Sequence, residues 1–442
     1  MIARRPLPAA TVYLLIQGLG SASFATAFTL SAIYRSRSAG LDPFQLILLG
    51  TALEAAAFLF EVPTGVVADA VSRRLSVIVG YGLIGAGIVL EGSFPLFGTI
   101  LVAQVIWGIG STFTSGAEAA WLADEIGEDA AARLYLRGAQ AGQAGAFFGI
   151  LLCVALGSVR LNLPFLVGGA GFIALAAILW RSMPEAGFTP VPRAERETWA
   201  ALGGTFRGGL TEARRSPRIG TIFLIAAIAG AASEAYDRLW EVRVLQVGLP
   251  DAGDLDPLVW FGVINIGGLV LSIATTEVVR RRALPEREAV VVRWLVWIKA
   301  GLVLAVAAVA VAPSFASAMV AVWAVTILRG LNGPLSMAWL NRGLPSRNRA
   351  TILSMYGQAD ALGQIGGGPV LGAVGARSGI PAALAGAALF LSPAIWLTHR
   401  AREGPETATL TAAEPAPPSP ADAVTPVVAG RGGETPDDHP GP

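Results

Sequence analysis

Acidic side chains within long apolar stretches are the residues of this 442-residue chain whose types and positions could do chemistry. A charged group costs about 2.5–3.5 kcal/mol to place at the centre of a membrane helix, so each one requires a reason. If the apolar stretches are membrane helices, the rise of 1.5 Å per residue sets the depth of each group. A buried carboxyl group can bind and release a proton, and the sequence offers these proton-coupling candidates: Glu54 and Asp360 near mid-depth, Glu118 about 9 Å from the inner edge, and Glu234.

Arg329 and Asp360 lie at matching depths, about 16 Å and about 15 Å from the same edge of consecutive apolar stretches. We expect them either to pair or to face one central cavity together, and a static buried ion pair is the structural alternative. Glu54 also lies about 16 Å deep, with no opposite charge near it in sequence. Glu234 precedes Arg238 by one helical turn, so a local ladder of ion pairs that includes Glu241 is the alternative there.

The side chains that serve enzymes and metal sites are nearly absent. Cys153 is the only cysteine, and His399 and His439 lie at or beyond the last apolar stretch, which argues against a metal site and against a Cys–His nucleophile pair. No Gly-x-x-x-x-Gly-Lys-Ser/Thr loop occurs, so we do not expect ATP hydrolysis by this chain. A net charge of +1 gives no basic surplus for nucleic acid. We expect no catalytic residues, no cofactor and no metal, and a proton gradient as the energy source.

The elements that position these residues are membrane helices. Hydrophobic residues make up 54% of the chain and charged residues 14%, whereas a soluble domain carries roughly 25% charged residues. A spanning helix needs about 20 mostly apolar residues. We predict twelve such helices, at residues 10–33, 43–68, 75–92, 96–121, 134–156, 162–180, 219–241, 257–278, 289–311, 316–340, 350–374 and 380–398.

Arginine placement orients these helices, because the cytoplasmic flanks of membrane helices collect positive charge. With the N-terminus inside, 24 arginines fall on the cytoplasmic side and 6 on the opposite side. Lys299, within a predicted helix, is expected to snorkel toward the cytoplasm. We therefore expect a multi-pass protein of the bacterial cell (inner) membrane with both termini in the cytoplasm.

Two similar halves are predicted on either side of a central polar break. The N-terminal six-helix half covers 1–181, a cytoplasmic loop covers 182–218, the C-terminal six-helix half covers 219–399, and a tail expected to be disordered covers 400–442. Ala120-Trp121-Leu122 recurs as Ala338-Trp339-Leu340, and each copy ends the fourth predicted helix of its half. Parallel six-helix repeats are a known design of membrane transporters.

The loop after the second predicted helix carries a resemblance to a known family. It reads Gly65-Val66-Val67-Ala68-Asp69-Ala70-Val71-Ser72-Arg73-Arg74, which resembles the Gly-x-x-x-Asp-Arg-x-Gly-Arg-Arg signature of the major facilitator superfamily. Ala70 and Ser72 depart from it, where the family usually has a basic residue and a glycine. The segments 60–64 and 115–125 are similar to drug–proton antiporter-like exporters of this superfamily, and the resemblance covers residues 10–400.

The resemblance implies an all-α integral membrane protein with twelve transmembrane helices in two six-helix pseudo-repeats, the major facilitator fold. It implies that the loop gates the cytoplasmic side, with Asp69 facing the start of the eleventh helix near 348–351, whereas plain positive flanking is the alternative for the arginines. The gating motif is then Gly65, Asp69, Arg73, Arg74 and Asp124. The fold also implies that the first, fourth, seventh and tenth helices line the substrate cavity, with the candidates Gln17, Gln104, Trp107, Arg329 and Asn332.

Glycines mark two places where helices could approach closely or bend. The fifth predicted helix holds Gly138, Gly142, Gly145 and Gly149, but it lacks the proline that the antiporter branch often carries there. Small residues at this spacing permit close helix contact. The run Gly366-Gly367-Gly368-Pro369 predicts a pliable or broken eleventh helix, and a simple kink is the alternative.

These features together predict a monomeric secondary transporter of small molecules that works by alternating access in the lipid bilayer. Proton-coupled efflux of bulky apolar or amphipathic compounds is the function that the resemblance favours. The alternative is a proton-coupled importer of a small polar or anionic nutrient, in which Arg329 would hold the anionic group. A membrane-embedded enzyme is a third hypothesis, which the near absence of histidine and cysteine disfavours.

Overall fold

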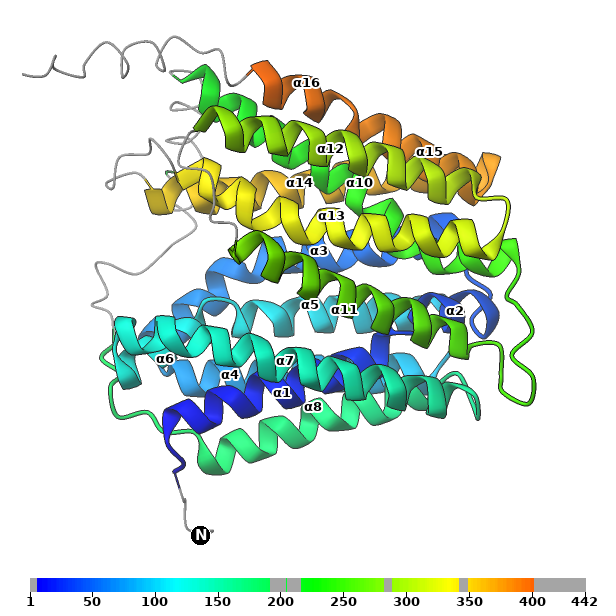
Figure 1. The fold of residues 1–442 in the computed structure, drawn as a ribbon. Coiled ribbons are helices and arrows are strands. Elements are labelled where there is room, and N and C mark those ends of the chain that lie inside the picture. The colour runs from blue at the N-terminus through cyan, green and yellow to red at the C-terminus, as the bar shows by residue number, and fades with distance from the viewer. Residues whose placement is uncertain (1–5, 191–203, 205–215, 282–287, 342–348, 401–442) are drawn as a thin grey trace, which may run out of the picture. The chain divides into compact units, whose positions relative to one another are not determined.

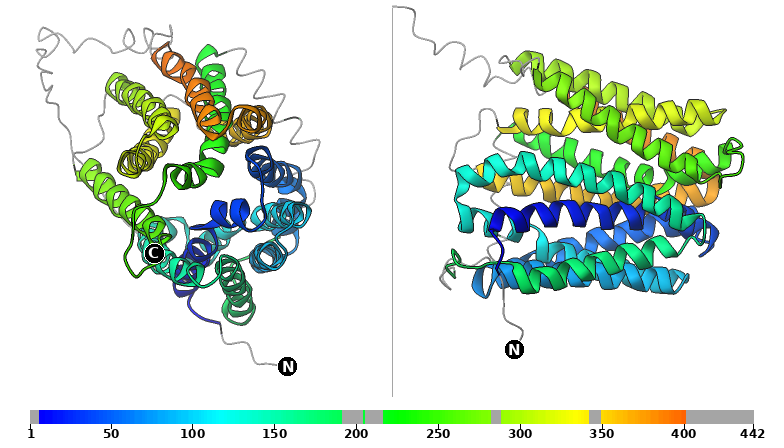
Figure 2. Two further views of the ribbon diagram at one scale, coloured as in Figure 1. Left: turned by 90° about the vertical axis from the view of Figure 1, so that its right-hand side faces the viewer. Right: turned by 60° about the horizontal axis from the view of Figure 1, so that its bottom comes forward.

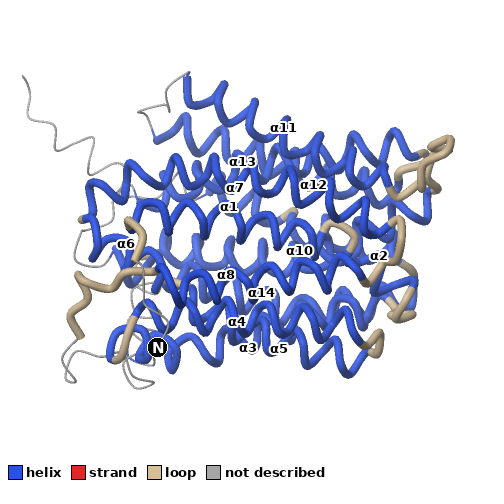
Figure 3. The backbone as a smooth tube through the Cα atoms, turned by 90° about the horizontal axis from the view of Figure 1, so that it is seen from below, coloured by secondary structure: helices blue, strands red, loops and turns tan. Residues whose placement is uncertain are grey.

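The structure is a computed structural model that describes residues 6–190, 204, 216–281, 288–341 and 349–400. The first part of the chain forms these helices: α1 (Ala9–Phe28), α2 (Ser31–Arg37), α3 (Pro43–Ala70), α4 (Arg73–Ser93), α5 (Phe97–Thr114), α6 (Ala117–Ile126), α7 (Glu128–Gly157) and α8 (Leu163–Ser182). The second part forms α10 (Pro217–Val247), α11 (Val259–Arg281), α12 (Glu288–Val311), α13 (Phe315–Asn341), α14 (Arg349–Ser378), α15 (Ile380–Leu391) and α16 (Pro393–Arg400). The described residues contain no strand (Figure 3).

The helices run side by side, with their loops gathered at the two ends of the bundle (Figure 1). Among the described residues, eleven helical segments are long and apolar enough to cross a membrane. The segment α14, of 30 residues with seven glycines among them, is the twelfth. The prediction of an all-α protein with twelve membrane helices is therefore confirmed. In lipid every backbone N–H and C=O group needs a partner within the protein, and a helix provides one for each. The short loops lie outside lipid, where water can serve as the partner.

We call the end that holds the backbone hydrogen bond from Leu7 to Ser182 the near end. The opposite end, where Asn162 donates to the carbonyl of Gly92, is the far end. Helices α1 to α8 lie together and helices α10 to α16 lie together, as the view along the helices shows (Figure 2, left). The predicted boundaries at 181 and 218 stay a prediction, because most of the central segment lies outside the described residues, as does the chain beyond 400.

Three of the predicted membrane helices are interrupted. The first breaks at Thr29–Leu30 between α1 and α2, and the last breaks at Ser392. The fourth breaks between α5 and α6, where Gly116 takes a φ of 70°, a conformation that side chains with a Cβ rarely adopt. These interruptions were not predicted, and the one at Gly116 sets Glu118 at the start of a separate helix.

The predicted break in the eleventh helix is wrong, because α14 continues through Pro369. Its glycines serve close packing instead. A Cβ on Gly367 would overlap the side chain of Ala231 on α10, and one on Gly368 would lie 2.6 Å from the hydroxyl of Thr51 on α3. The helix α14 therefore lies against both α10 and α3 without any room between the backbones.

The predicted close contact of the fifth helix is present between α7 and α1. A Cβ on Gly145 would overlap the carbonyl oxygen of Gly18, and one on Gly149 would overlap that of Ala22. A Cβ on Gly142 would lie 3.0 Å from the hydroxyl oxygen of Ser21. This contact holds α1 in the position from which Gln17 and Phe24 reach the first cavity described below.

Candidate functional site

A cavity of about 370 Å³ lies within the first group of helices, and we call it the aromatic cavity. Its polar lining comes from Gln17 and Ser21 of α1, and its walls are largely aromatic, formed by Phe24, Tyr81, Trp107 and Phe172. The rings of Phe24 and Trp107 are 6.0 Å apart, and those of Tyr81 and Phe172 are stacked at the same separation. A mainly apolar pocket with a few fixed polar groups is typical of small-molecule sites.

Glu118, at the start of α6, connects to this cavity through two of its lining residues. The amide nitrogen of Gln17 donates to one carboxylate oxygen at 2.6 Å, and the hydroxyl of Tyr81 donates to the other at 2.9 Å. Within the described part of the chain, no arginine or lysine forms an ion pair with Glu118. The carboxylate thus has two neutral donors and no cationic partner.

A second cavity, of about 300 Å³, lies within the second group of helices, and we call it the charged cavity. Five of its lining residues are polar or charged, and four of them come from α10, α12 and α13: Ser233, Lys299, Arg329 and Asn332. Asp360 of α14 completes the polar lining, and Leu302, Val306 and Leu391 form much of the rest. Of the predicted cavity residues, Arg329 and Asn332 lie here, whereas Gln17 and Trp107 line the aromatic cavity.

Arg329 and Asp360 face the charged cavity together, but they do not pair with each other. Arg329 donates to Asp237 at 2.5 Å, and its guanidinium lies 4.6 Å from the ring centre of Tyr236. Asp360 accepts a hydrogen bond of 2.9 Å from Gln364, one turn along α14. The predicted Arg329–Asp360 ion pair is therefore wrong, and the alternative of a shared cavity describes both residues.

The prediction that Lys299 snorkels toward the cytoplasm is wrong. Its side chain is only 4% exposed, and its ammonium donates to the amide oxygen of Asn332 at 3.3 Å. The sequence placed Lys299 correctly inside a helix, but its depth alone could not tell a buried side chain from one that reaches the cytoplasm.

Glu54 lines a third pocket, of about 290 Å³, between the near-end halves of α3 and α14. Glu61, two turns further along α3, shares this pocket with Ser354 and Gln358. In the described part of the chain, Glu54 makes no hydrogen bond or ion pair. Glu234 differs, because it forms an ion pair of 2.8 Å with Arg238, as the local ladder predicted.

The ladder does not extend to Glu241. This buried carboxylate instead accepts a hydrogen bond of 3.1 Å from the backbone nitrogen of Ala32, in the first turn of α2. Gly50 of α3 lies so close to α10 that a Cβ there would overlap the carboxylate of Glu234. The two groups of helices therefore meet in the far half of the bundle through polar side chains, a contact that we call the far seal.

Beside the far seal lies a cluster of charged residues that the sequence did not reveal. Arg35 and Glu91 are 2% and 1% exposed, and their side chains are joined by hydrogen bonds of 2.7 and 3.2 Å. Gln104, predicted to line the substrate cavity, lies in neither large internal cavity and donates to Glu91 at 2.8 Å. Arg35 is one of the six arginines that the sequence places on the opposite side, and only its position at the end of an apolar stretch indicates burial.

The gating motif lies at the near end and ties together parts of the first group of helices. Arg73 forms an ion pair of 2.5 Å with Asp124 and a longer one of 3.7 Å with Asp69. Arg74 donates instead to the backbone oxygens of Trp180 and Met183 at the end of α8.

Of the expected partner segment of Asp69, near 348–351, residue 348 lies outside the described residues, and the side chains of 349–351 are not described. A Cβ on Gly65 would meet no atom within 4 Å, so close packing does not require a glycine there.

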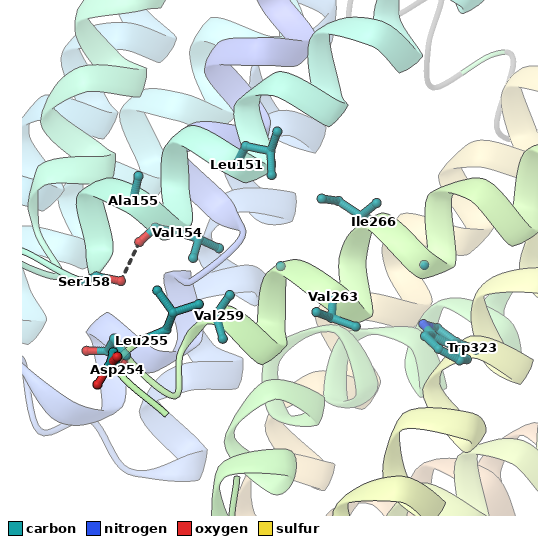
Figure 4. A pocket seen from close by; sticks show the side chains of 13 residues that line it. Leu151, Val154, Ala155, Ser158, Asp254, Leu255, Val259, Val263, Ile266 and Trp323 are labelled. Atoms are coloured by element: carbon teal, nitrogen blue, oxygen red, sulfur yellow. Dashed lines mark hydrogen bonds between the residues drawn. The ribbon is translucent and has the colours of Figure 1, made fainter. Parts of the chain in front are cut away.

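A larger groove, of about 870 Å³, lies between α7 and α11 (Figure 4). Its walls are apolar, with Leu151 and Val154 on one side and Val263, Ile266 and Trp323 on the other. Leu151 is 47% and Val263 40% exposed, as expected for side chains that face hydrocarbon. Its polar side chains, Ser158, Asp254 and Asp256, lie at the far end of the bundle rather than at mid-depth, so this groove is a weaker candidate for the substrate site than the two internal cavities.

Comparisons with known proteins match this architecture. A family model described as Major Facilitator Superfamily matches residues 12–367. A relative from Bacillus subtilis (strain 168), the uncharacterized MFS-type transporter YxaM, is 22% identical over 385 residues, which are 85% of this chain and 91% of the relative.

Three solved structures share the fold at low sequence identity. The nucleoside transporter NupG has a TM-score of 0.67 at 14% identity, over 90% of this chain and 98% of its own. A POT family transporter in complex with a thioalcohol conjugated peptide has a TM-score of 0.69 at 13% identity, over 88% of this chain and 94% of its own. A bacterial homolog of the human lysosomal transporter Spinster, inward-facing and unoccupied, has a TM-score of 0.65 at 15% identity, over 90% of this chain and 98% of its own. The chain belongs to the Major Facilitator Superfamily, and it is a membrane transporter rather than an enzyme.

Proposed function

We propose that this transporter exports amphipathic compounds in exchange for protons. In this proposal, the compound binds at the aromatic cavity, and the two groups of helices rock about it by alternating access. The observation that carries the proposal is the carboxylate of Glu118, which is bound to two residues of that cavity and has no cationic partner in the described part of the chain.

The position of Glu118 gives a physical basis for exchange. A partly buried carboxylate without a cation is stabilised by one positive charge, from either a proton or the ammonium of a bound ligand. The two cannot occupy the same oxygen at once, so each displaces the other, as antiport requires. The aromatic rings of Phe24 and Trp107 would hold the apolar part of the compound and add cation–π attraction to its charged part.

Asp360 and Glu54 remain proton-coupling candidates in this proposal, because neither has an ion pair in the described residues. Glu234 is the weaker candidate, since Arg238 already compensates its charge at 2.8 Å. The arginine asymmetry supports cytoplasmic termini in the inner membrane of a bacterial cell. The far end then faces the outside, the far seal closes it, and Arg73 with its two acidic partners belongs to the cytoplasmic gate.

Proton-coupled import of a small anionic nutrient is the second candidate function. The charged cavity favours it, because this cavity holds two cationic side chains, Lys299 and Arg329, at mid-depth. The sign of the gradient effect separates the two functions, since antiport moves the compound toward the acidic compartment and symport moves it away from that compartment.

The test uses proteoliposomes with DNA trapped inside, whose fluorescence reports the entry of ethidium, an aromatic cation. We expect an acidic interior to drive ethidium inward, and Glu118→Gln to slow this uptake about tenfold, as expected when a charge-assisted contact is lost. Glu128→Gln, at an exposed acid on α7, is the matched control and is expected to behave as wild type. Uptake driven only by an acidic exterior, or wild-type rates in Glu118→Gln, would overturn the proposal.

A further inference from the structure

Lys299 is the only lysine of this chain, in which arginine supplies all the other 31 positive side chains. It lies in the middle of α12, it is 4% exposed, and it lines the charged cavity. An ammonium group without a counter-charge is unfavourable in such a place, because burial removes the water that would stabilise it. Packing alone therefore does not explain a buried cation of this kind.

The hydrogen bonds of Lys299 leave it incompletely satisfied. An ammonium has three donors, and the structure gives it a single acceptor, the amide oxygen of Asn332 at 3.3 Å. Within the described residues, no carboxylate lies close enough to form an ion pair with it. Two of its donors therefore have no acceptor among the described residues, although they face a cavity of about 300 Å³.

The other cation of the cavity does not share this condition, and Asp360, which has no ion pair in the described residues, is not close enough to pair with Lys299. Arg329 is compensated by Asp237 at 2.5 Å and by the ring of Tyr236. Asp360 accepts a hydrogen bond from Gln364. Arg329, which the sequence suggested as the anion-binding group, is thus already neutralised by protein, and the uncompensated positive charge belongs to Lys299.

We propose that Lys299 and Asn332 bind the carboxylate of a small organic acid in the charged cavity. The ligand supplies the counter-charge that no carboxylate of the described residues gives to Lys299, and its oxygens accept hydrogen bonds from the two remaining donors of the ammonium. Asn332 fixes the ammonium and can donate its own amide hydrogens to the same carboxylate. This proposal names a substrate class for the second candidate function, proton-coupled import. It rests on that function only for the transport of such an acid. The binding itself does not depend on the direction of transport.

Binding is measured with radiolabelled benzoate on the full-length protein in lipid nanodiscs. We expect wild type to bind benzoate saturably and Lys299→Met to lose about tenfold or more in affinity, which matches the loss of a charge-assisted hydrogen bond. Arg293→Met removes an exposed cation from the same helix and is expected to bind as wild type. Asn332→Ala is expected to lose affinity by a smaller factor. Benzamide, of the same shape without the charge, is expected not to compete.

Thermal unfolding separates this role from a structural one. If Lys299 serves binding, Lys299→Met removes an uncompensated buried charge, and its melting temperature is expected to equal or exceed that of wild type. A lower melting temperature together with unchanged benzoate binding would show that the lysine is structural and would overturn the proposal. So would benzamide competing as well as benzoate.

Chemical labelling gives a second, independent measure of occupancy. Because the chain has one lysine, reductive methylation with formaldehyde and a borane modifies only Lys299 and the terminal amine, and mass spectrometry distinguishes the two. We expect benzoate to slow the methylation of Lys299 several-fold and to leave the terminal amine unaffected. A Lys299 rate that benzoate does not change would contradict the proposal. Neither measurement involves transport, so the failure of ethidium–proton exchange and the failure of this inference can be told apart.

Discussion

The ion pair between Arg35 and Glu91 is expected to be a strong determinant of stability, although it lies away from both internal cavities. Its two side chains are 2% and 1% exposed, and they meet through two hydrogen bonds of 2.7 and 3.2 Å. Gln104 donates to the same carboxylate at 2.8 Å, and Tyr34 donates to the backbone oxygen of Glu91. Arg35→Met would leave Glu91 buried with the amide of Gln104 as its remaining side-chain donor.

The magnitude follows from the burial of both partners. Breaking a buried ion pair by removal of one partner costs about 3–5 kcal/mol, whereas replacing both partners by apolar residues is often neutral or stabilising. At about 2 °C per kcal/mol for a large domain, Arg35→Met is expected to lower the melting temperature by about 6–10 °C. The double variant Arg35→Met with Glu91→Leu is expected to recover most of that loss.

The assay is thermal unfolding of each variant in the same lipid nanodiscs, with Arg160→Met as the control for removal of an exposed arginine near the far end. The reasoning is refuted if Arg35→Met melts like wild type. It is equally refuted if the double variant melts no higher than the single one, because the loss would then come from packing rather than from an uncompensated charge.

Two further predictions concern the aromatic cavity and the near end. Gly145→Leu is expected to push α1 away from α7, because a Cβ at this position overlaps the carbonyl oxygen of Gly18. Unfolding in nanodiscs should show a loss of about 1–3 kcal/mol, and ethidium exchange should fall with it, whereas Gly82→Leu, with no atom within 4 Å of its Cβ, should keep both. Arg73→Met is expected to cost no more than about 1 kcal/mol, because its acidic partners are partly exposed, yet to slow ethidium exchange. A large loss of stability, or an unchanged exchange rate, would contradict a gating role.

The membrane helices could be predicted from the sequence because each depends on local composition. Lipid requires a continuous apolar helix, and a stretch of about 20 such residues announces it without reference to the rest of the chain. The breaks were harder to predict. The sequence around Gly116 indicates a break no more clearly than the sequence around Gly367 does. Gly116 nevertheless separates α5 from α6, whereas Gly367 packs inside an unbroken helix.

The partners of the charged residues could not be predicted, because depth along a helix fixes only one coordinate. Arg329 and Asp360 have matching depths, but the direction in which each side chain leaves its helix decides its partner. Arg329 therefore pairs with Asp237, 92 residues away in sequence, and Arg35 pairs with Glu91, 56 residues away. The i,i+4 pair of Glu234 and Arg238 was predictable, since one helix sets its geometry.

The far seal has a consequence for the energy of opening. It consists of charged and polar groups, with Gly50 against the ion pair of Glu234 and Arg238, and Glu241 bonded to the backbone of Ala32. These groups are poorly solvated while the seal is closed, but water hydrates them as soon as the helices part. If the helices part there, as the proposed alternating access requires, hydration offsets much of the free energy lost with these contacts, so we expect the open and closed forms to differ little in free energy. A membrane potential of 100 mV supplies only about 2.3 kcal/mol per charge, and we expect a seal of this composition to open under a driving force of that size.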